Sequence, residues 1–234
     1  MVLCIILICV AVICLAIYLY EKIKEYSLKM VFIKAIVSLL FVAVGLYNSL
    51  KGFDGGDTYK IFIVLGLAFG LAGDIFLDLK YVYPDHDDVY TYLGFITFAL
   101  GHVSFISGMI GAMPFKINLL YYFIPVILAC GIATLILILE KPMKLVFGEM
   151  KVIVFIYSVF LFSMPLYALF FSIYSGFNNP FLIMMMIGGV LFAISDLILS
   201  QTYFGSYHEK PIDFVLNYLF YYSAQFVIAM SLFF

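Results

Sequence analysis

KIFIVLGLAFGLAGDIFLDL, residues 60–79, is an apolar run that carries an acid, Asp74, deep within it. The run PFLIMMMIGGVLFAISDLILS, residues 180–200, carries Asp196 in the same way. As a helix rising about 1.5 Å per residue, each run is long enough to cross the roughly 30 Å of hydrocarbon in a bilayer. A carboxylate at membrane depth costs about 2.5–3.5 kcal/mol even on a lenient insertion scale, so we interpret both aspartates as candidate functional residues.

The composition is that of a membrane protein. Hydrophobic residues make up 66% of the 234 residues, charged residues make up 11%, and the mean hydropathy is +1.19. A soluble domain has about 25% charged residues, so this chain is far too apolar for one. The formal net charge of −2 gives no sign of a nucleic-acid partner. We therefore expect the protein to lie in a lipid bilayer and to bind no nucleic acid.

Eight apolar stretches are long enough to span a bilayer as helices. The first begins at Met1 without a basic segment before it, which predicts a retained helix and not a signal peptide. The loops between the stretches are short, so the sequence predicts an all-α bundle of eight transmembrane helices in one integral-membrane domain, residues 1–234. The similarity of AGDIFLD to ISDLILS, four stretches apart, hints at two related four-helix halves. The expected spans are residues 2–20, 30–48, 60–79, 89–110, 117–139, 152–174, 180–203 and 213–233.

The lysines predict an orientation in the cell membrane. Odd-numbered loops hold eight of them: Lys22, Lys24, Lys29, Lys80, Lys141, Lys144, Lys151 and Lys210. The opposite side holds only Lys51, Lys60 and Lys116. By the positive-inside rule, the odd-numbered loops are cytoplasmic and both termini lie outside. The spans 60–79 and 180–203 then run in the same direction, so Asp74 and Asp196 lie at matching depth.

Helical spacing gathers further candidates around the two acids. Gly66, Gly70, Asp74 and Asp78 recur every fourth residue, which places two carboxylates and two small residues on one helix face. A lipid chain is expected to reach the acids along this small-residue face. Lys34 in the second span lies near the aspartates in depth and can pair with a carboxylate. The remaining polar candidates are His102, Tyr157, Ser195, Tyr222 and Gln225.

Purely structural interpretations stand beside these functional ones. For Asp74 and Asp196 the alternative to function is burial with Ser, Tyr or Lys34 partners. For Asp78 we favour a solvated or snorkelling position near the membrane surface. His102 is as well explained by packing as by chemistry. Tyr18, close to a helix end, has the position of an aromatic membrane-interface anchor. Because His102 is the only one of three histidines placed in mid-membrane, a zinc site of several histidines is disfavoured, and we expect no metal and no cofactor. A metal held by Asp and His together is the alternative left open.

Five motifs follow one another along the predicted helices: GLAGDIFLD (70–78), GFITFALGHVSFI (94–106), VFIYSVFLFSMPLYA (154–168), GGVLFAISDLILSQTYF (188–204) and YYSAQFVIAMS (221–231). In this order they resemble the YhhN-like lysoplasmalogenases. The resemblance extends from Lys34 to the C-terminus. Where the family often has Lys-Pro, this chain has Lys34-Ala35, which predicts an unkinked second helix.

The resemblance implies an integral-membrane hydrolase of lysophospholipids. Such an enzyme cleaves the vinyl-ether bond of a lysoplasmalogen into a fatty aldehyde and glycerophosphoethanolamine or glycerophosphocholine. We expect Asp74 to donate a proton and Asp196 to stabilise the resulting cation and activate water, with the reverse assignment left open. His102 would relay protons or orient water. Substrate contacts are expected from Lys34, Asp78, Tyr157, Ser195, Tyr222 and Gln225.

Two other classes of function remain open at this stage. Intramembrane Asp and His residues also form proton relays, so a proton-coupled transporter is the main alternative. A bundle that binds lysolipid without turnover is the third. The membrane-protein assignment is common to all three.

Overall fold

The structure is a computed structural model that describes residues 1–22, 27–51, 58–114, 117–205 and 211–234. Within these ranges eight helices are long and apolar enough to cross a membrane, and no residue belongs to a β-strand. The prediction of an all-α polytopic membrane bundle is confirmed. The helices are α1 (Val2–Lys22), α2 (Leu28–Leu50), α3 (Thr58–Val82), α4 (Asp87–Gly111), α5 (Leu120–Ile138), α6 (Lys151–Tyr174), α7 (Pro180–Phe204) and α8 (Pro211–Ser231).

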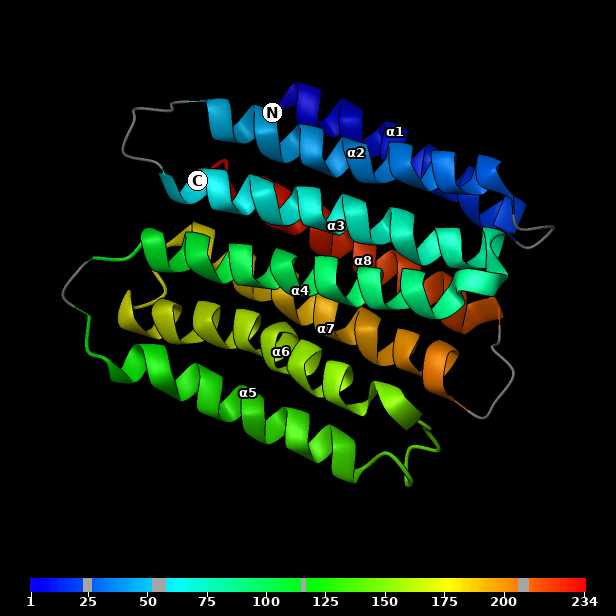
Figure 1. Cartoon of the computed structure of the whole chain (residues 1–234). Coiled ribbons are helices and arrows are strands. Elements are labelled where there is room, and N and C mark those ends of the chain that lie inside the picture. Colours follow the sequence, from blue (N-terminus) through cyan, green and yellow to red (C-terminus); the bar gives the residue numbers. More distant parts are fainter. Residues whose placement is uncertain (23–26, 52–57, 115–116, 206–210) are drawn as a thin grey trace.

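Successive helices run in opposite directions, so α1, α3, α5 and α7 all end at the same end of the bundle (Figure 1). We call this the lysine-rich end, because Lys22, Lys80 and Lys151 lie there. Both chain termini lie toward the opposite end (Figure 1). Which end faces the cytoplasm stays a prediction. Other residues used for the orientation or metal arguments lie outside the described residues: Lys24, Lys116, Lys210 and His208.

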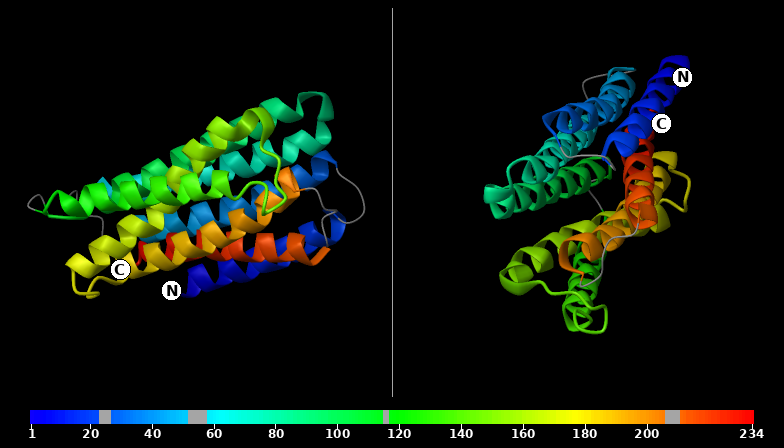
Figure 2. Two further views of the ribbon diagram at one scale, coloured as in Figure 1. Left: turned by 90° about the horizontal axis from the view of Figure 1, so that it is seen from below. Right: turned by 90° about the vertical axis from the view of Figure 1, so that its right-hand side faces the viewer.

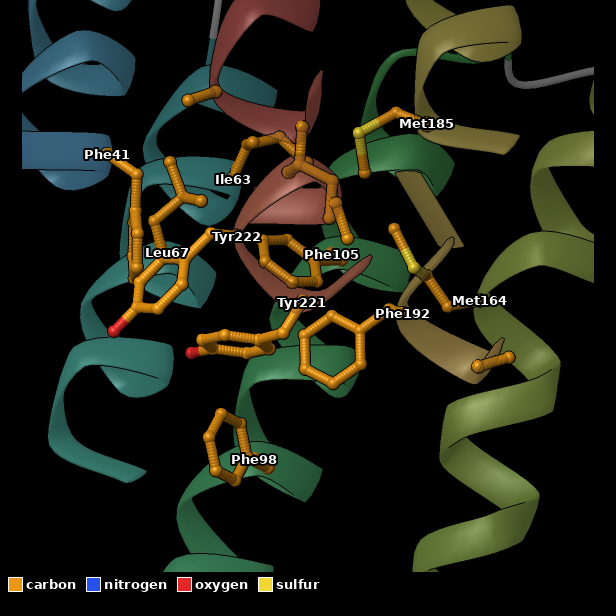
Figure 3. Close-up of a cluster of buried hydrophobic side chains, with 14 of the residues drawn as sticks. Phe41, Ile63, Leu67, Phe98, Phe105, Met164, Met185, Phe192, Tyr221 and Tyr222 are labelled. Atoms are coloured by element: carbon orange, nitrogen blue, oxygen red, sulfur yellow. The ribbon is translucent and has the colours of Figure 1, made fainter. Parts of the chain in front are cut away.

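The bundle is built from paired helices (Figures 1 and 2). α3 packs along α4, and α7 packs along α8. α1 and α5 lie at opposite edges, where α1 packs against α2 and α5 packs against α6. The core between them is aromatic and aliphatic, as expected for helices held together by close packing in lipid. Figure 3 shows part of this core, including Phe41, Phe105, Phe192 and Tyr221.

The glycine face of α3 is filled by neighbouring helices. A Cβ atom added at Gly66 would lie 2.4 Å from the Phe105 ring, and one added at Gly70 would lie 2.7 Å from the Gln225 amide nitrogen. These glycines therefore allow close helix packing. The expectation that a lipid chain passes along this face is wrong, because Phe105 and Gln225 already occupy it.

Residues 139–150, which connect α5 to α6, fold back against the lysine-rich end of the bundle. The backbone N–H of Val146 donates to the carbonyl of Phe204 at 2.8 Å. A Glu140 carboxylate oxygen accepts the Phe147 N–H at 2.9 Å, and Lys151 Nζ lies 2.7 Å from the other oxygen. The Lys151 ammonium, followed by the Phe147 N–H, lowers the pKa of Glu140 below its usual value. This 139–150 segment is thus fixed in place by contacts with α6 and α7.

Candidate active site

Asp74 on α3 is surrounded by hydrogen-bond donors from α2 and α8. Its Oδ2 accepts the Ser38 hydroxyl at 2.5 Å and the Tyr221 hydroxyl at 2.7 Å. Lys34 Nζ lies 3.5 Å from its Oδ1. The side chain is almost fully enclosed, and Lys34 in the unbroken helix α2 is buried beside it. This arrangement suits an ionised carboxylate, because two hydroxyls and an ammonium point at its oxygens.

Asp78, one helical turn further along α3, is a second buried carboxylate. Its Oδ1 lies 2.9 Å from Lys34 Nζ, so Lys34 bridges the two acids. The Tyr18 hydroxyl from α1 donates to it, at 3.1 Å from Oδ1 and 2.9 Å from Oδ2. The side chain is 5% exposed. The expectation of a solvated Asp78 is wrong, and so is that of Tyr18 as an interface anchor, because the two residues satisfy each other inside the bundle.

The polar network continues from Tyr18 to the lysine-rich end. The Tyr18 and Tyr218 hydroxyls are 2.9 Å apart, and Lys22 Nζ donates to Tyr218 at 2.6 Å. Lys22, Tyr218, Tyr18, Asp78, Lys34 and Asp74 thus form one continuous series of contacts across α1, α2, α3 and α8. Two lysines face two aspartates in it, so the series is balanced in charge.

Asp196 on α7 has a much sparser environment. The Tyr157 hydroxyl of α6 donates to its Oδ2 in a short hydrogen bond. Within the described part of the chain, no lysine lies within ion-pair distance of Asp196. Asp196 is partly exposed, whereas Asp74 is only 2% exposed. The two acids therefore differ in their partners and in their accessibility.

Asp74 and Asp196 line one cavity in the half of the bundle nearest the lysine-rich end. Its volume, counted as the space that the centre of a water molecule can occupy, is about 100 Å³. Most of the wall is apolar, with side chains from α4, α5, α6, α7 and the 139–150 segment. The polar part of the wall lies on α2, α3, α6, α7 and α8. Its members are Lys34, Asp74, Tyr157, Ser158, Ser195, Asp196, Ser200, Tyr203, Asn217, Tyr218 and Tyr221.

The cavity separates the candidate residues into two groups. Lys34, Asp74, Tyr157, Ser195 and Asp196 line it. The other candidates do not belong to its wall, although two of them contact residues that do, and a third contacts Ser38, which donates to Asp74. Asp78 holds Lys34, Tyr222 contacts the Ser38 hydroxyl at 3.2 Å, and Gln225 donates to the Tyr221 hydroxyl at 3.1 Å. His102 is the fourth candidate that does not line the cavity.

His102 is buried among aromatic rings on α4. Its ring centre is 4.7 Å from that of Phe192 and 5.9 Å from that of Tyr157. Neither ring nitrogen has a hydrogen-bond partner within the described residues, and the side chain is 1% exposed. The imidazole does not line the cavity, but it lies next to Tyr157, which does.

Several residues that line or support the site were not selected from the sequence. Tyr221 takes its position between Phe98 and Phe192, with its hydroxyl directed away from Phe192 (Figure 3). Asn217 donates to the backbone carbonyl of Ser195 at 2.8 Å and to its hydroxyl at 3.0 Å, which ties α8 to α7 beside Asp196. The four-residue spacing of Asn217, Tyr221 and Gln225, which places them on one face of α8, is the sequence pattern that indicates these residues.

The described residues contain no group of three or more His, Cys, Asp or Glu side chains placed to hold a metal ion. The polar groups that meet in the cavity are carboxylates, hydroxyls, an amide and an ammonium. This set of groups supports proton transfer between acids and bases.

Comparison with known proteins gives the chain a family. No curated protein and no solved structure matches it significantly. The model of the YhhN family matches residues 30–232, which include α2 from Met30 onward, all of α3 to α8 and every residue that lines the cavity. Since this match covers most of the chain and the membrane helices that carry the two aspartates, the protein belongs to the YhhN family.

Proposed function

We propose that the protein hydrolyses the vinyl-ether bond of lysoplasmalogens, using Asp74 and Asp196 as an acid–base pair. The observation that carries the proposal is that two carboxylates with different partners line one largely apolar cavity. Membership of the YhhN family supports the same reaction class. The substrate is a single-chain ether phospholipid, and the products are a fatty aldehyde and a glycerophospho-alcohol.

Hydrolysis of a vinyl ether begins with protonation of the β-carbon, which leaves an oxocarbenium ion at the α-carbon. Water adds to that carbon and loses a proton to a base. The hydroxyl of the resulting hemiacetal then gives up its proton as the bond to the glycerol oxygen breaks. That oxygen takes up a proton and leaves as the alcohol, and the aldehyde forms. The reaction consumes one water molecule and leaves the number of protons on the enzyme unchanged. It therefore needs one group that gives a proton and a nearby carboxylate that stabilises positive charge.

The environments of the two acids favour Asp196 as the donor and Asp74 as the stabilising carboxylate, the reverse of the assignment made from sequence. Asp74 accepts two hydroxyl hydrogen bonds and lies beside Lys34, which suits a group that stays ionised. Asp196 has the Tyr157 hydroxyl on Oδ2, and its Oδ1 is available to carry a proton. Ser195 and Tyr157 lie beside Asp196 in the cavity wall and would orient the substrate or the attacking water.

Aldehyde release by the purified protein tests this function. The protein in detergent is incubated with lysoplasmalogen, and aldehyde and glycerophospho-alcohol are quantified together. We expect equal amounts of both products from the unmodified protein and none from Asp74→Asn or Asp196→Asn. Asp85→Asn, an exposed acid outside the cavity, serves as the control and keeps full activity. Full activity in either cavity variant contradicts the proposal.

The series of contacts from Lys22 to Asp74 favours proton-coupled transport as the second candidate, since such series carry protons in membrane proteins. The two candidates differ in their product. A transporter in liposomes takes up a solute when a pH gradient is applied and leaves lysoplasmalogen intact, whereas the proposed hydrolase forms aldehyde without any gradient.

A further inference from the structure

The cavity that holds the two aspartates has an apolar side formed by three neighbouring helices. Ile136 on α5, Phe162 on α6 and Leu197 on α7 line this side. Each of them also has exposed surface: Leu197 is 40% exposed, and Ile136 and Phe162 are partly exposed. All three lie within membrane-spanning helices, so the medium outside them is the hydrocarbon of the bilayer.

The 139–150 segment covers part of the end of the cavity toward the loops. Leu145 and Phe147 of this segment line the cavity and are themselves buried. The backbone of the segment is bonded to Phe204 at the end of α7, and its Glu140 side chain is held by Lys151. A ligand that entered from water past this segment would have to displace these contacts, whereas one that entered between Ile136, Phe162 and Leu197 would meet apolar side chains.

We propose that one hydrocarbon chain of a single-chain lipid reaches Asp196 from the bilayer through an opening bordered by Ile136, Phe162 and Leu197. The lipid's identity as a lysoplasmalogen rests on the proposed function, but the opening does not. The chain lies against the apolar walls of α5, α6 and α7. The polar end of the same molecule lies at the opposite wall, where Asp74, Lys34 and Asn217 are placed.

This opening is bordered by α5, α6 and α7, whereas the glycine face of α3 is filled by Phe105 of α4 and Gln225 of α8. Leu197 directly follows Asp196 in the chain, so the residue that borders the opening and the proposed proton donor lie on successive positions of α7. A lipid chain inserted beside Leu197 therefore brings the first atoms after its head group next to Asp196.

Because the chain contains no tryptophan, one introduced tryptophan reports on this opening alone. Phe162→Trp places the indole in the cavity wall. Val190→Trp is the matched control, since Val190 is on α7, is 47% exposed and does not line the cavity. The probe is a saturated-ether lysophospholipid brominated on its chain, which quenches nearby indole fluorescence and has no vinyl-ether bond to hydrolyse.

The two variants are compared at constant detergent concentration. In Phe162→Trp, quenching is expected to saturate as the brominated lipid is added and to reverse with the unbrominated lipid. In Val190→Trp it should rise in proportion to the fraction of brominated lipid in the micelle. Identical, non-saturating quenching in both variants overturns the proposal. The measurement does not use turnover, so a protein that fails to release aldehyde but shows saturable quenching refutes the proposed function and leaves the opening standing.

Narrowing the opening supplies a second test. Leu197→Trp is expected to raise KM for long-chain lysoplasmalogen by about tenfold with kcat little changed, which is the scale of losing a methylene-sized contact in an apolar pocket. A short, water-soluble vinyl ether should be hydrolysed as before. Val190→Trp should change neither constant. Equal effects of the two substitutions, or an equal loss with short and long substrates, contradict the proposed route.

Discussion

The Tyr18 hydroxyl contacts both carboxylate oxygens of Asp78, at 3.1 and 2.9 Å, although the two residues lie on different helices and sixty positions apart in sequence. Tyr18 belongs to α1, which lies outside the part of the chain that the YhhN family model matches. This contact makes α1 a structural component of the site, because Asp78 in turn holds Lys34 next to Asp74.

Loss of the Tyr18 hydroxyl is expected to destabilise the protein. Tyr18→Phe removes the hydroxyl hydrogen bond to Asp78 without changing the ring, and leaving a buried acid short of a donor costs about 1–3 kcal/mol. The free energy of unfolding in detergent and SDS mixtures measures this change. Tyr83→Phe, at a side chain that is 43% exposed, is the control and should unfold as the unmodified protein does. If both variants have the same free energy of unfolding, the hydrogen bond between Tyr18 and Asp78 contributes nothing to stability.

Removal of Lys34 should have a larger effect than removal of either partner acid. Lys34→Met leaves Asp74 and Asp78 buried without their shared cation, and breaking a buried ion pair from one side destabilises by about 3–5 kcal/mol. Adding Asp78→Asn to this variant removes one of the two unpaired charges. We therefore expect the double variant to be more stable than Lys34→Met alone, and strictly additive losses would contradict the shared ion pair.

Tyr157→Phe is expected to lower kcat by about 10–100-fold with little change in KM, because Asp196 loses the group that orients it and misplaced catalytic groups cause losses of this size. Tyr167→Phe is the matched control on α6. Tyr167 also loses one hydrogen bond, to the carbonyl of Tyr122 at 2.8 Å, but does not line the cavity. If both variants lose kcat equally, the effect belongs to the stability of α6 and not to Asp196.

The Glu140–Lys151 contact predicts a pH dependence of stability. Because Lys151 and the Phe147 N–H lower the pKa of Glu140, the contact stabilises the folded state above the ordinary glutamate pKa of about 4.3. This contribution is lost as the pH falls through the lowered pKa. The midpoint of thermal unfolding of Glu140→Gln should therefore lie below that of the unmodified protein at pH 7. The two midpoints should converge in more acidic buffer, and a difference that grows toward low pH would contradict the prediction.

The membrane spans could be predicted from sequence because hydrophobicity alone determines them. The expected span 180–203 and the observed helix Pro180–Phe204 differ at one end by one residue, and no helix long enough to span the membrane was missed among the described residues. Lys34 beside Asp74 was predicted from depth, and the structure places the two 3.5 Å apart. The proposal of two related halves is untested and stays a prediction.

The rest of the site depends on which helices become neighbours. Tyr18 looks like an interface anchor in the sequence because it lies near a helix end, and only the packing of α1 against the bundle shows it buried beside Asp78. The sequence predicts a solvated Asp78 for the same reason, because this residue also lies near a helix end. The 139–150 segment has no apolar span that would predict its position, and its place at the cavity depends on Phe204 and Lys151.

The most direct measurement of the central claim is the position of deuterium in the aldehyde formed in D₂O. The products are reduced at once to the alcohol, so that later exchange is prevented, and are analysed by mass spectrometry. If the protein hydrolyses the vinyl ether by protonating its β-carbon, the unmodified protein gives a product with one deuterium on the carbon next to the former carbonyl, and Asp196→Asn gives no product. An aldehyde without deuterium at that carbon, or no aldehyde from the unmodified protein, contradicts the account.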